Sequence, residues 1–395
     1  MFSMNIIIYR YKSICEPDFI SAFKGLGLDV IEDTDGMASE LSLEQKINRL
    51  GNLISDNKPL FVFTINYYPF ISILCDKLHV FYLSMTVDVP VFEIFNASIR
   101  SPFNRIFLFD KDQCNEIYSE NPSCIFHLPL GAACERISET LGDTEDYRYN
   151  ISFIGSLYNE KDPLSQLSNL PSKTKKAIDK AINIQLESEV YGHFCLDPLI
   201  NSDIIDALKQ SDEDFYPSTL SIKNIDKYVA TNDYVCPHMT YTERVKVLNL
   251  LAKEISGDSL HLFTSSNTKG LSSNLNIHSP VDSLNEMPFV FRQSKINLNI
   301  TTRSISSGLS QRIWDVLACR GFLITNYQPE IDLFFKDGVH LVTYKSYDEL
   351  IEKTAYYLEH DEERETIAQN GFREICERGS VTARTLTMLK IITGI

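Results

Sequence analysis

The sequence predicts an α/β protein built of two doubly wound domains, with a helical insertion in its C-terminal half. The first observation is length, because 395 residues suit two domains of ordinary size. The second is composition: 44% hydrophobic and 23% charged residues are typical of a globular chain with buried cores. The third is the repeated alternation of short apolar runs with helical patterns, which implies parallel sheets covered by helices.

The first domain is expected at residues 1–148, where apolar strands alternate with amphipathic helices. The expected strands lie at 5–9, 60–65, 80–86, 105–109 and 123–128, and the expected helices at 16–23 and 42–55. In the helix at 42–55, apolar residues recur on one face. Strands that alternate with helices in this way form a parallel sheet.

The second domain is expected at residues 149–378, interrupted by an insertion at about 160–238. The insertion is polar, and its periodic stretches near 174–188 and 200–211 predict helices. Further strands are expected at 150–155 and 260–264, and further helices at 243–255, 347–358 and 362–378. Residues 379–395 are expected to form a C-terminal helix that crosses back to the first domain.

The stretch at 295–330 organises the second domain, because it predicts a strand, a loop, a helix and another strand in succession. Ile296 and Leu298 alternate with polar residues, which is the period of a strand with one better-buried face. The serines and glycine at 306–308 supply N-cap chemistry for a helix that follows at once, and 322–324 reads as a buried parallel strand. Free N–H groups and the helix dipole at this loop favour an anion such as a phosphate.

The charge of the chain excludes several classes of partner. A net charge of −16 is repelled by nucleic acid and by an anionic membrane surface, so neither is expected as a partner.

Nine scattered cysteines, without zinc-like spacing, fit free thiols in a reducing compartment. The apolar stretches fall short of a transmembrane helix, and the N-terminal run is too short for a signal peptide. We therefore expect a cytoplasmic protein without a transmembrane segment.

Arg312 and Asp315 are the first candidate binding residues. They lie three residues apart in the predicted helix and so share a face. A guanidinium beside a diphosphate, with a carboxylate that accepts hydrogen bonds from ribose hydroxyls, is the chemistry of a nucleotide-sugar pocket. On spacing alone, a surface ion pair on a crossover helix is the alternative.

The segment SGLSQRIWDVLACRGFLITNYQPEIDLFF, followed by DGVHLVTYKSYDELIEKTAYYLEHDEERETIAQNG, resembles the donor-binding region of the CgeB-like glycosyltransferases, a bacterial branch of the group 1 transferases. The residues that match the family pattern are Ser307-Gly308, Arg312, Trp314-Asp315 and the run from Cys319 to Phe322. Arg320 stands where the family often has Gly. The resemblance implies the GT-B fold, with two Rossmann-like domains that face each other across a cleft. It also implies a role in bacterial cell-surface glycosylation.

A second patch, ISFIGSLYNEKDP, resembles the first strand and loop of the donor domain in the same group. The group has a Gly-Arg-Leu turn followed by Lys, and the residues in those places are Gly155, Ser156, Leu157 and Lys161. Gly155 would let a phosphate approach the backbone, and Lys161 would supply a point charge, or would be an ordinary solvated lysine. Ser307 takes the place of a glutamate found in many retaining members, so the resemblance does not carry a retaining mechanism over.

Three further sites are candidates, and the first two rest on the same resemblance. Asp88, in FYLSMTVDVP, would lie at the carboxyl edge of a strand and act as general base on an acceptor hydroxyl, or would cap the turn before Pro90. The turn at Val281 and Asp282 would contact the base or ribose, or would only connect two elements. Arg303 is expected as a second phosphate contact or as a solvated cation.

The resemblance implies transfer of a sugar from a nucleotide-diphosphate donor to a hydroxyl on a protein, a polysaccharide or a lipid-linked glycan. Fixed cations and a helix N-terminus would stabilise the departing diphosphate, so neither a metal nor another cofactor is expected. The expected phosphate contacts are Gly155, Lys161, Arg303, Ser307, Gly308 and Arg312. Two alternatives are a nucleotide-sugar epimerase of the same fold, which would return an isomer of the donor, and a non-catalytic subunit that binds a partner or a glycan.

Overall fold

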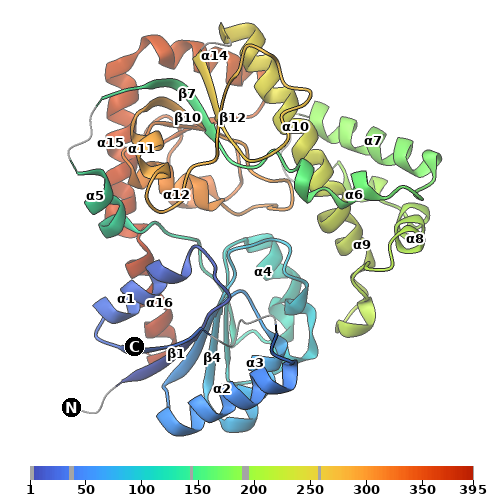
Figure 1. Cartoon of the computed structure of the whole chain (residues 1–395), viewed down its shortest axis with the longest axis vertical. Coiled ribbons are helices and arrows are strands. Elements are labelled where there is room, and N and C mark those ends of the chain that lie inside the picture. The colour runs from blue at the N-terminus through green and yellow to red at the C-terminus, as the bar shows by residue number, and fades with distance from the viewer. Residues whose placement is uncertain (1–3, 35–39, 143–145, 189–194, 257–258, 395) are drawn as a thin grey trace. The chain divides into compact units, whose positions relative to one another are not determined.

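A computed structural model describes residues 4–34, 40–142, 146–188, 195–256 and 259–394 (Figure 1). Its internal contacts divide the chain into two compact units. The first unit comprises Met1–Ala133, Ser218–Asn224 and Gly379–Ile395, and the second comprises Cys134–Pro217 and Ile225–Arg378. The expected first boundary was 148, whereas the contact pattern changes after Ala133. Two segments of the predicted domains lie outside the described residues: 143–145, which were predicted to belong to the first domain, and 189–194, which were predicted to belong to the insertion.

The first unit contains six parallel strands in the order β2-β1-β3-β4-β5-β6. The strands are β1 (Asn5–Tyr9), β2 (Asp29–Asp33), β3 (Phe61–Ile65), β4 (Phe81–Met85), β5 (Asn104–Leu108) and β6 (Ile125–His127). The helices are α1 (Glu16–Gly25), α2 (Leu43–Asn57), α3 (Pro69–Leu78), α4 (Lys111–Ile117) and α16 (Val381–Thr393). The predicted doubly wound sheet is confirmed for this unit.

Local sequence explains these elements. Ile7, Val62 and Tyr82 occupy paired positions on three neighbouring strands and are fully buried. Apolar runs of this kind are typical of parallel strands covered on both faces. A capping box starts α2, because the Ser42 hydroxyl accepts the Gln45 N–H at 3.2 Å and the Gln45 side chain accepts the Ser42 N–H at 2.8 Å.

The C-terminal helix α16 groups with the first unit and packs against α1 (Figure 1). The N–H of Ala132 donates to the carbonyl of Gly379 at 2.9 Å, and the N–H of Val381 donates to the carbonyl of Ala132 at 2.9 Å. The guanidinium of Arg384 adds a hydrogen bond to the carbonyl of Leu130 at 3.0 Å. These contacts attach the last helix to the end of the first unit.

The second unit contains six parallel strands in the order β12-β11-β10-β7-β8-β9. The strands are β7 (Tyr149–Ile154), β8 (Leu260–Phe263), β9 (Asn276–His278), β10 (Ser294–Asn299), β11 (Leu323–Asn326) and β12 (Val342–Tyr344). The helices are α5 (Cys134–Leu141), α6 (Pro163–Gln166), α7 (Ser172–Glu187), α8 (Ser202–Ser211), α9 (Asp226–Val229), α10 (Cys236–Leu251), α11 (Met287–Arg292), α12 (Gln311–Ala318), α13 (Ile331–Phe334), α14 (Tyr347–Glu359) and α15 (Asp361–Arg378). The second predicted sheet is therefore also confirmed.

Strand β10 is buried on both faces, although its alternating pattern predicted one better-buried face. Asn297 is only 1% exposed, and its amide donates to the carbonyls of Phe291 and Phe322 and accepts from the Ser152 hydroxyl. Asn299 is 4% exposed and donates to the hydroxyl of Thr325 at 2.9 Å. Hydrogen bonds to the neighbouring strands thus compensate for burial of the polar face.

The helix after this strand begins later than predicted. Ser310 occupies the N-cap position of α12, and its hydroxyl makes no capping bond to the helix. The predicted cap at 306–308 was wrong, because those residues belong to the loop that precedes the helix. At the other end, Arg320 has a φ of +55°, a left-handed conformation that costs a non-glycine residue about 1–2 kcal/mol. The glycine that often stands at this position in the family that the chain resembles adopts a left-handed conformation without this free-energy cost.

The insertion is helical as predicted, with α7 packed against α8 and with α6 packed against α10 (Figure 1). A π-helix at Ala230–Val235 joins α9 to α10. His238 on α10 shares a hydrogen bond of 2.7 Å with Asp162, which caps α6. Burial lowers the pKa of His238, but the hydrogen bond and charge of Asp162 raise the pKa above its usual value overall. The contact therefore joins α6 to α10 through a hydrogen bond between His238 and Asp162.

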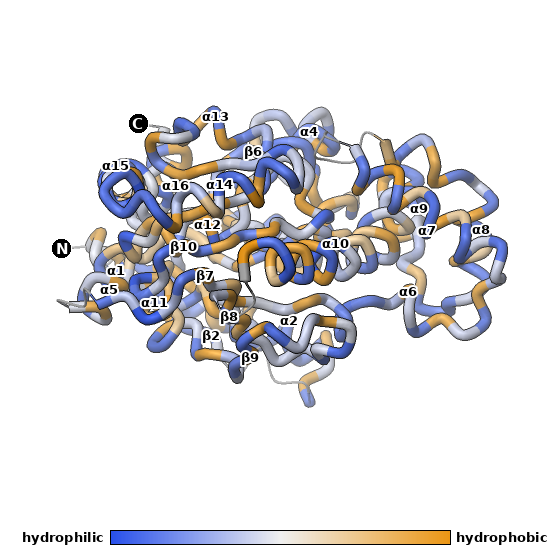
Figure 2. Tube along the Cα trace, turned by 90° about the horizontal axis from the view of Figure 1, so that it is seen from above, coloured by the Kyte–Doolittle hydropathy of each residue, from blue (hydrophilic) through white to orange (hydrophobic). Residues whose placement is uncertain are grey.

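Helix α15 is hydrophilic along most of its length (Figure 2). Its few buried positions include Ile367, Gly371 and Ile375, and the helix packs against α12. No helix in the described parts of the chain is both long and apolar enough to cross a membrane.

Replacement of Gly371 by Ala is expected to destabilise the second unit by about 1–3 kcal/mol. A Cβ at this position would overlap the carbonyl of His340 and would lie 2.8 Å from Cδ2 of Leu317. Calorimetric unfolding of the full chain measures the effect. Gly51→Ala is the matched control, because the new methyl group would make only an ordinary contact at 3.8 Å to Leu74. Equal unfolding temperatures for Gly371→Ala and Gly51→Ala would contradict the close packing.

Candidate functional site

The second sheet reverses its order between β7 and β10, because β8 and β9 extend from one side of this pair and β11 and β12 from the other. Ligands of open α/β sheets bind at the carboxyl ends of strands beside such a reversal. Gly155 follows β7 at this point, with a φ of +152° that favours glycine. A Cβ there would lie 3.9 Å from Nη2 of Arg312. The space beside the Gly155 backbone is therefore open on the side of the Arg312 guanidinium.

Arg244 on α10 joins the two strands of the reversal. Its Nη1 donates to the carbonyl of Ser156 and its Nη2 to the carbonyl of Ile300, each at 2.6 Å. The side chain lies over the rings of Phe153 and Tyr158, with its Cζ at 5.4 and 4.9 Å from the ring centroids. Burial lowers the pKa of Arg244, and its Nε–H has no partner among the described residues. Arg244 was not among the binding residues that we predicted from the sequence.

Arg312 on α12 is half-buried near Arg244. Its guanidinium contacts the thioether of Met287 and lies 5.3 Å from the ring centroid of Phe291. Burial lowers the pKa of Arg312; Asp315 raises it in part, and the positive charge of Arg244 lowers it further. Within the described ranges neither Arg244 nor Arg312 has an ion-pair partner, so a bound anion would stabilise both charges.

Asp315 lies one turn after Arg312 on the same helix, as the predicted spacing requires. Its Oδ1 accepts a hydrogen bond from Nε2 of Gln311 at 2.8 Å. The carboxylate is half-buried, which is compatible with the expected ribose contact. The structure thus places Gly155, Arg312 and Asp315 in one region of the second unit.

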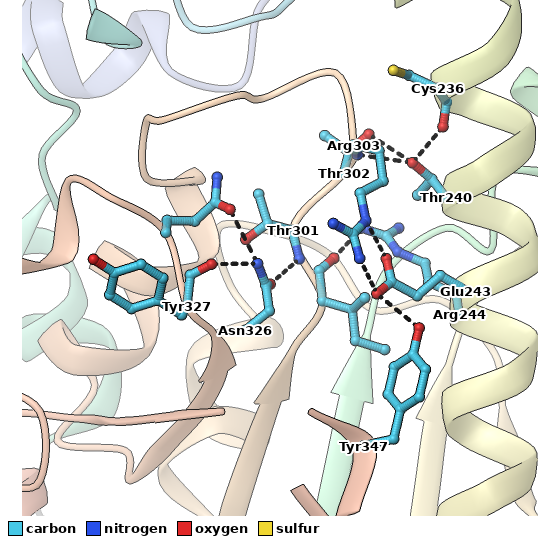
Figure 3. A network of polar contacts seen from close by, with 12 residues as sticks. Cys236, Thr240, Glu243, Arg244, Thr301, Thr302, Arg303, Asn326, Tyr327 and Tyr347 are labelled. Carbon is cyan, nitrogen blue, oxygen red and sulfur yellow. Dashed lines mark hydrogen bonds and ion pairs between the residues drawn. The ribbon is translucent and has the colours of Figure 1, made fainter. Parts of the chain in front are cut away.

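Arg303 lies in a different environment from Arg312. Its Nε and Nη2 donate to the two carboxylate oxygens of Glu243 at 2.7 and 2.5 Å, and its N–H donates to Thr240 at 2.9 Å (Figure 3). Both charged side chains of this pair are buried, and the Tyr347 hydroxyl approaches Glu243 at 3.4 Å. The guanidinium therefore already has a bidentate carboxylate partner within the protein.

Ser307 and Gly308 lie in the loop before α12 and are buried. The hydroxyl of Ser307 donates to Glu330 at 2.8 Å, and the carbonyl of Gly308 accepts from Gln328 at 3.1 Å. These contacts fix the loop that precedes Arg312. The Ser307 hydroxyl thus donates to a carboxylate within the protein, whereas we predicted that it contacts a phosphate of the donor.

Lys161 lies on the exposed side of the loop that follows Gly155. Its Nζ is 5.4 Å from the ring centroid of Tyr158. In the same loop the Ser156 hydroxyl donates to Glu160 at 2.5 Å, and the Ser266 hydroxyl donates to Glu160 at 2.8 Å. Burial tends to raise the pKa of Glu160, but these hydrogen bonds lower it overall, so the carboxylate is ionised. Ser156 stands where the family that the chain resembles has an arginine, and its hydroxyl contacts a carboxylate instead of a phosphate.

Val281 and Asp282 form the turn that leads into α11. The carboxylate of Asp282 accepts the N–H groups of Leu284 and Asn285 at 3.1 and 2.8 Å, so it closes the turn. Val281 is half-buried and Asp282 is exposed. The helix that follows carries Met287, which contacts Arg312. The turn is therefore connected to the guanidinium through one short helix.

In the first unit, Asp88 follows β4 at the carboxyl edge of the sheet and is exposed. Its Oδ2 accepts from Nδ2 of Asn66 at 2.8 Å, and Oδ1 of Asn66 accepts the N–H of Val87 at 3.0 Å. Asn66 has a φ of +57°, a conformation that asparagine tolerates better than most residues. The amide thus fixes the direction of an exposed carboxylate, as a general base requires.

Among the described residues no group of three or more His, Cys, Asp or Glu side chains could hold a metal ion.

Comparison with known proteins places these sites in a fold. Residues 245–390 match a family described as glycosyl transferase-like. No curated protein matches the chain. A solved glycosyltransferase from Rickettsia africae is 12% identical, over 100% of this chain and 99% of that one, with a TM-score of 0.53. Sucrose-phosphate synthase from Thermosynechococcus elongatus is 9% identical, over 99% and 98% of the two chains, with a TM-score of 0.53.

A third solved structure, Anabaena HepE in complex with UDP-glucose, is 10% identical over 99% of this chain and 100% of its own, with a TM-score of 0.50. At these identities the likeness establishes the fold. The predicted α/β class with two parallel sheets of the GT-B type is confirmed. Together with the matched segment, it supports a glycosyltransferase, whereas the CgeB-like branch stays a prediction.

Loss of the Arg303 guanidinium is expected to destabilise the second unit by about 3–5 kcal/mol, because Glu243 would remain buried without its partner. Urea unfolding of Arg303→Met measures this loss. The double variant Arg303→Met with Glu243→Leu removes both charges, so it should recover most of the stability. An unfolding midpoint for Arg303→Met equal to that of the wild type would contradict a structural role for the pair.

Proposed function

We propose that the chain is a glycosyltransferase that moves a sugar from a nucleotide-diphosphate donor to an acceptor hydroxyl. The observation that carries this proposal is the position of Arg244 and Arg312 beside Gly155, where, among the described residues, neither guanidinium forms an ion pair with a carboxylate. The glycosyl transferase-like match of residues 245–390, which contains Arg312, supports the same assignment. The CgeB-like branch, and with it bacterial cell-surface glycosylation, rests on the sequence resemblance alone.

The diphosphate of the donor would bind at Gly155, between the two guanidiniums. Burial makes each cation costly on its own, so the free energy of binding an anion includes relief of their mutual repulsion. In a chain with a net charge of −16, a local excess of positive charge is unusual and favours a specific anionic ligand. Asp315 would accept from the ribose hydroxyls, and the backbone of Val281 and Asp282 would contact the nucleoside.

The same guanidiniums would stabilise the charge that develops on the leaving diphosphate, so we propose a reaction without a metal ion. Lys161, on the exposed side of the loop, would add a mobile charge near the phosphates. We also place the reaction in the cytoplasm, because all nine cysteines are free thiols.

Asp88 would serve as the general base. Its carboxylate would take the proton of the acceptor hydroxyl while the acceptor oxygen forms a bond to the anomeric carbon. The bond between that carbon and the diphosphate oxygen breaks at the same step, and the nucleoside diphosphate leaves with the electron pair. Attack from the side opposite the leaving group would invert the anomeric configuration.

Removal of the Arg312 guanidinium is expected to weaken diphosphate binding by about ten- to a hundredfold, the value of one charge-assisted hydrogen bond. Ligand-detected NMR with UDP, GDP, dTDP and CMP, each with its sugar nucleotide, measures the affinity of wild type and of Arg312→Met. The matched control is Arg373→Met, which removes an exposed arginine of the same unit. Uridine and the other nucleosides without phosphate should bind both variants alike. Absence of nucleotide binding to folded wild-type protein would overturn the donor site.

Asp88→Asn is expected to lower the transfer rate by about 10²–10⁴-fold, because the amide cannot accept the acceptor's proton. The asparagine keeps an oxygen for the Asn66 amide, so donor affinity should not change. Product formation from the sugar nucleotide that binds measures the rate, with Asp56→Asn, an exposed aspartate of α2, as control. An isomer of the donor formed without acceptor would instead establish the epimerase alternative.

A further inference from the structure

A cluster of aromatic rings lies at the carboxyl edge of the first sheet, where its order reverses between β1 and β3. Tyr9 ends β1, and its ring centroid lies 6.0 Å from that of Tyr68 and 5.8 Å from that of Phe70, both of which follow β3. Tyr68 lies 6.0 Å from Phe70 and 6.2 Å from Tyr11. All four pairs have edge-on geometry, which is the favourable arrangement for aromatic rings.

The cluster has a buried base and a half-exposed upper layer. Tyr9 is only 2% exposed, whereas Tyr11, Tyr68 and Phe70 retain part of their surface in water. The N–H of Tyr68 donates to the buried hydroxyl of Tyr82 at 2.9 Å, which fixes the backbone at the start of α3. The backbone that carries Tyr68 is therefore fixed, which lowers the free energy needed to order this residue when a ligand binds.

Polar groups border the rings. The amide of Asn66 donates to the hydroxyl of Tyr11 at 3.1 Å and to the carboxylate of Asp88 at 2.8 Å. Burial raises the pKa of Tyr11 to about 12, so its hydroxyl remains protonated at neutral pH. The edge thus combines apolar ring surface with a hydroxyl, an amide and a carboxylate within one network. Ligand sites typically combine aromatic walls with a few fixed polar groups.

We propose that Tyr11, Tyr68 and Phe70 form a platform for a sugar ring, and that the acceptor is therefore a carbohydrate. A pyranose ring has an apolar face of C–H groups, which stacks on aromatic rings, and a rim of hydroxyls, which suits Asn66 and Asp88. A bare serine or threonine side chain would leave the rings uncovered, and a lipid chain would cover the exposed Asp88 carboxylate with groups that cannot form hydrogen bonds to it. The inference rests on the proposed transferase function and names its acceptor class.

The test uses saturation-transfer NMR on the full chain with methyl glucosides, methyl galactosides, methyl mannosides and the methyl glycoside of N-acetylglucosamine. At least one is expected to bind, with the strongest transfer to the C–H groups of one ring face. Octanol and N-acetylserine amide are the competing probes for a lipid and a protein acceptor. Binding of only these two, or of no probe at all, would overturn the carbohydrate assignment.

Variants locate the platform. Tyr11→Ala and Phe70→Ala are each expected to weaken saccharide binding at least tenfold, whereas Tyr11→Phe keeps the ring and most of the affinity. Tyr118→Ala is the matched control, because Tyr118 is 48% exposed elsewhere in the same unit. Equal unfolding temperatures confirm that the variants fold; if Phe70→Ala does not, the comparison of Tyr11→Ala with Tyr11→Phe decides. Unchanged affinity in the alanine variants would overturn the platform.

Nucleoside diphosphate binding in the same samples separates the two claims. Diphosphate binding without saccharide binding overturns the carbohydrate acceptor and leaves the transferase proposal standing. Saccharide binding without any nucleotide binding overturns the transferase proposal, and with it the acceptor role of the platform. Binding of both, with saccharide affinity lost only in the ring variants, supports both.

Discussion

The second unit depends on the guanidinium of Arg244, which closes the sheet where its two halves meet. The sheet reverses its order between β7 and β10, so the segments that follow these two strands diverge. The backbone carbonyls of these segments therefore need hydrogen-bond donors from another part of the chain. Arg244 supplies one to Ser156 and one to Ile300. Each lost hydrogen bond of this kind costs about 1–3 kcal/mol when the group stays buried. The same two contacts hold the Arg244 guanidinium beside Gly155. Arg244 therefore stabilises the point where the strand order reverses and also makes it positively charged.

Glu243 and Arg244 are consecutive on α10 and have opposite roles, because consecutive helical side chains point about 100° apart. Glu243 forms the bidentate pair with Arg303, so its charge only partly offsets that of Arg244. A purely structural arginine would be served as well or better by a carboxylate of its own. The charge of Arg244 lowers the pKa of Arg312 in an otherwise acidic protein, and this repulsion is one reason why we propose an anion between them.

Periodicity predicted both sheets and most helices because it depends on neighbours within one element. It also placed Arg312, since the position of a residue at the start of a crossover helix is local information. Arg244 could not be found this way, because its partners lie 88 and 56 positions away in the sequence. The pairing of Arg303 spans 60 positions and was equally invisible. Alternation misled at Asn297, because a sheet covered on both faces buries the polar side as well.

Both sheets reverse their strand order once, and the two reversals carry different chemistry. The edge beside β7 offers unpaired guanidiniums, which suit a diphosphate and would gain little from an uncharged sugar. The edge beside β1 offers aromatic rings with an amide and a carboxylate, and Asp88 there would repel a diphosphate while it accepts a proton from a neutral hydroxyl. The charge at each edge is therefore the reason why we propose the donor at the second unit and the acceptor at the first, by a separate argument for each unit.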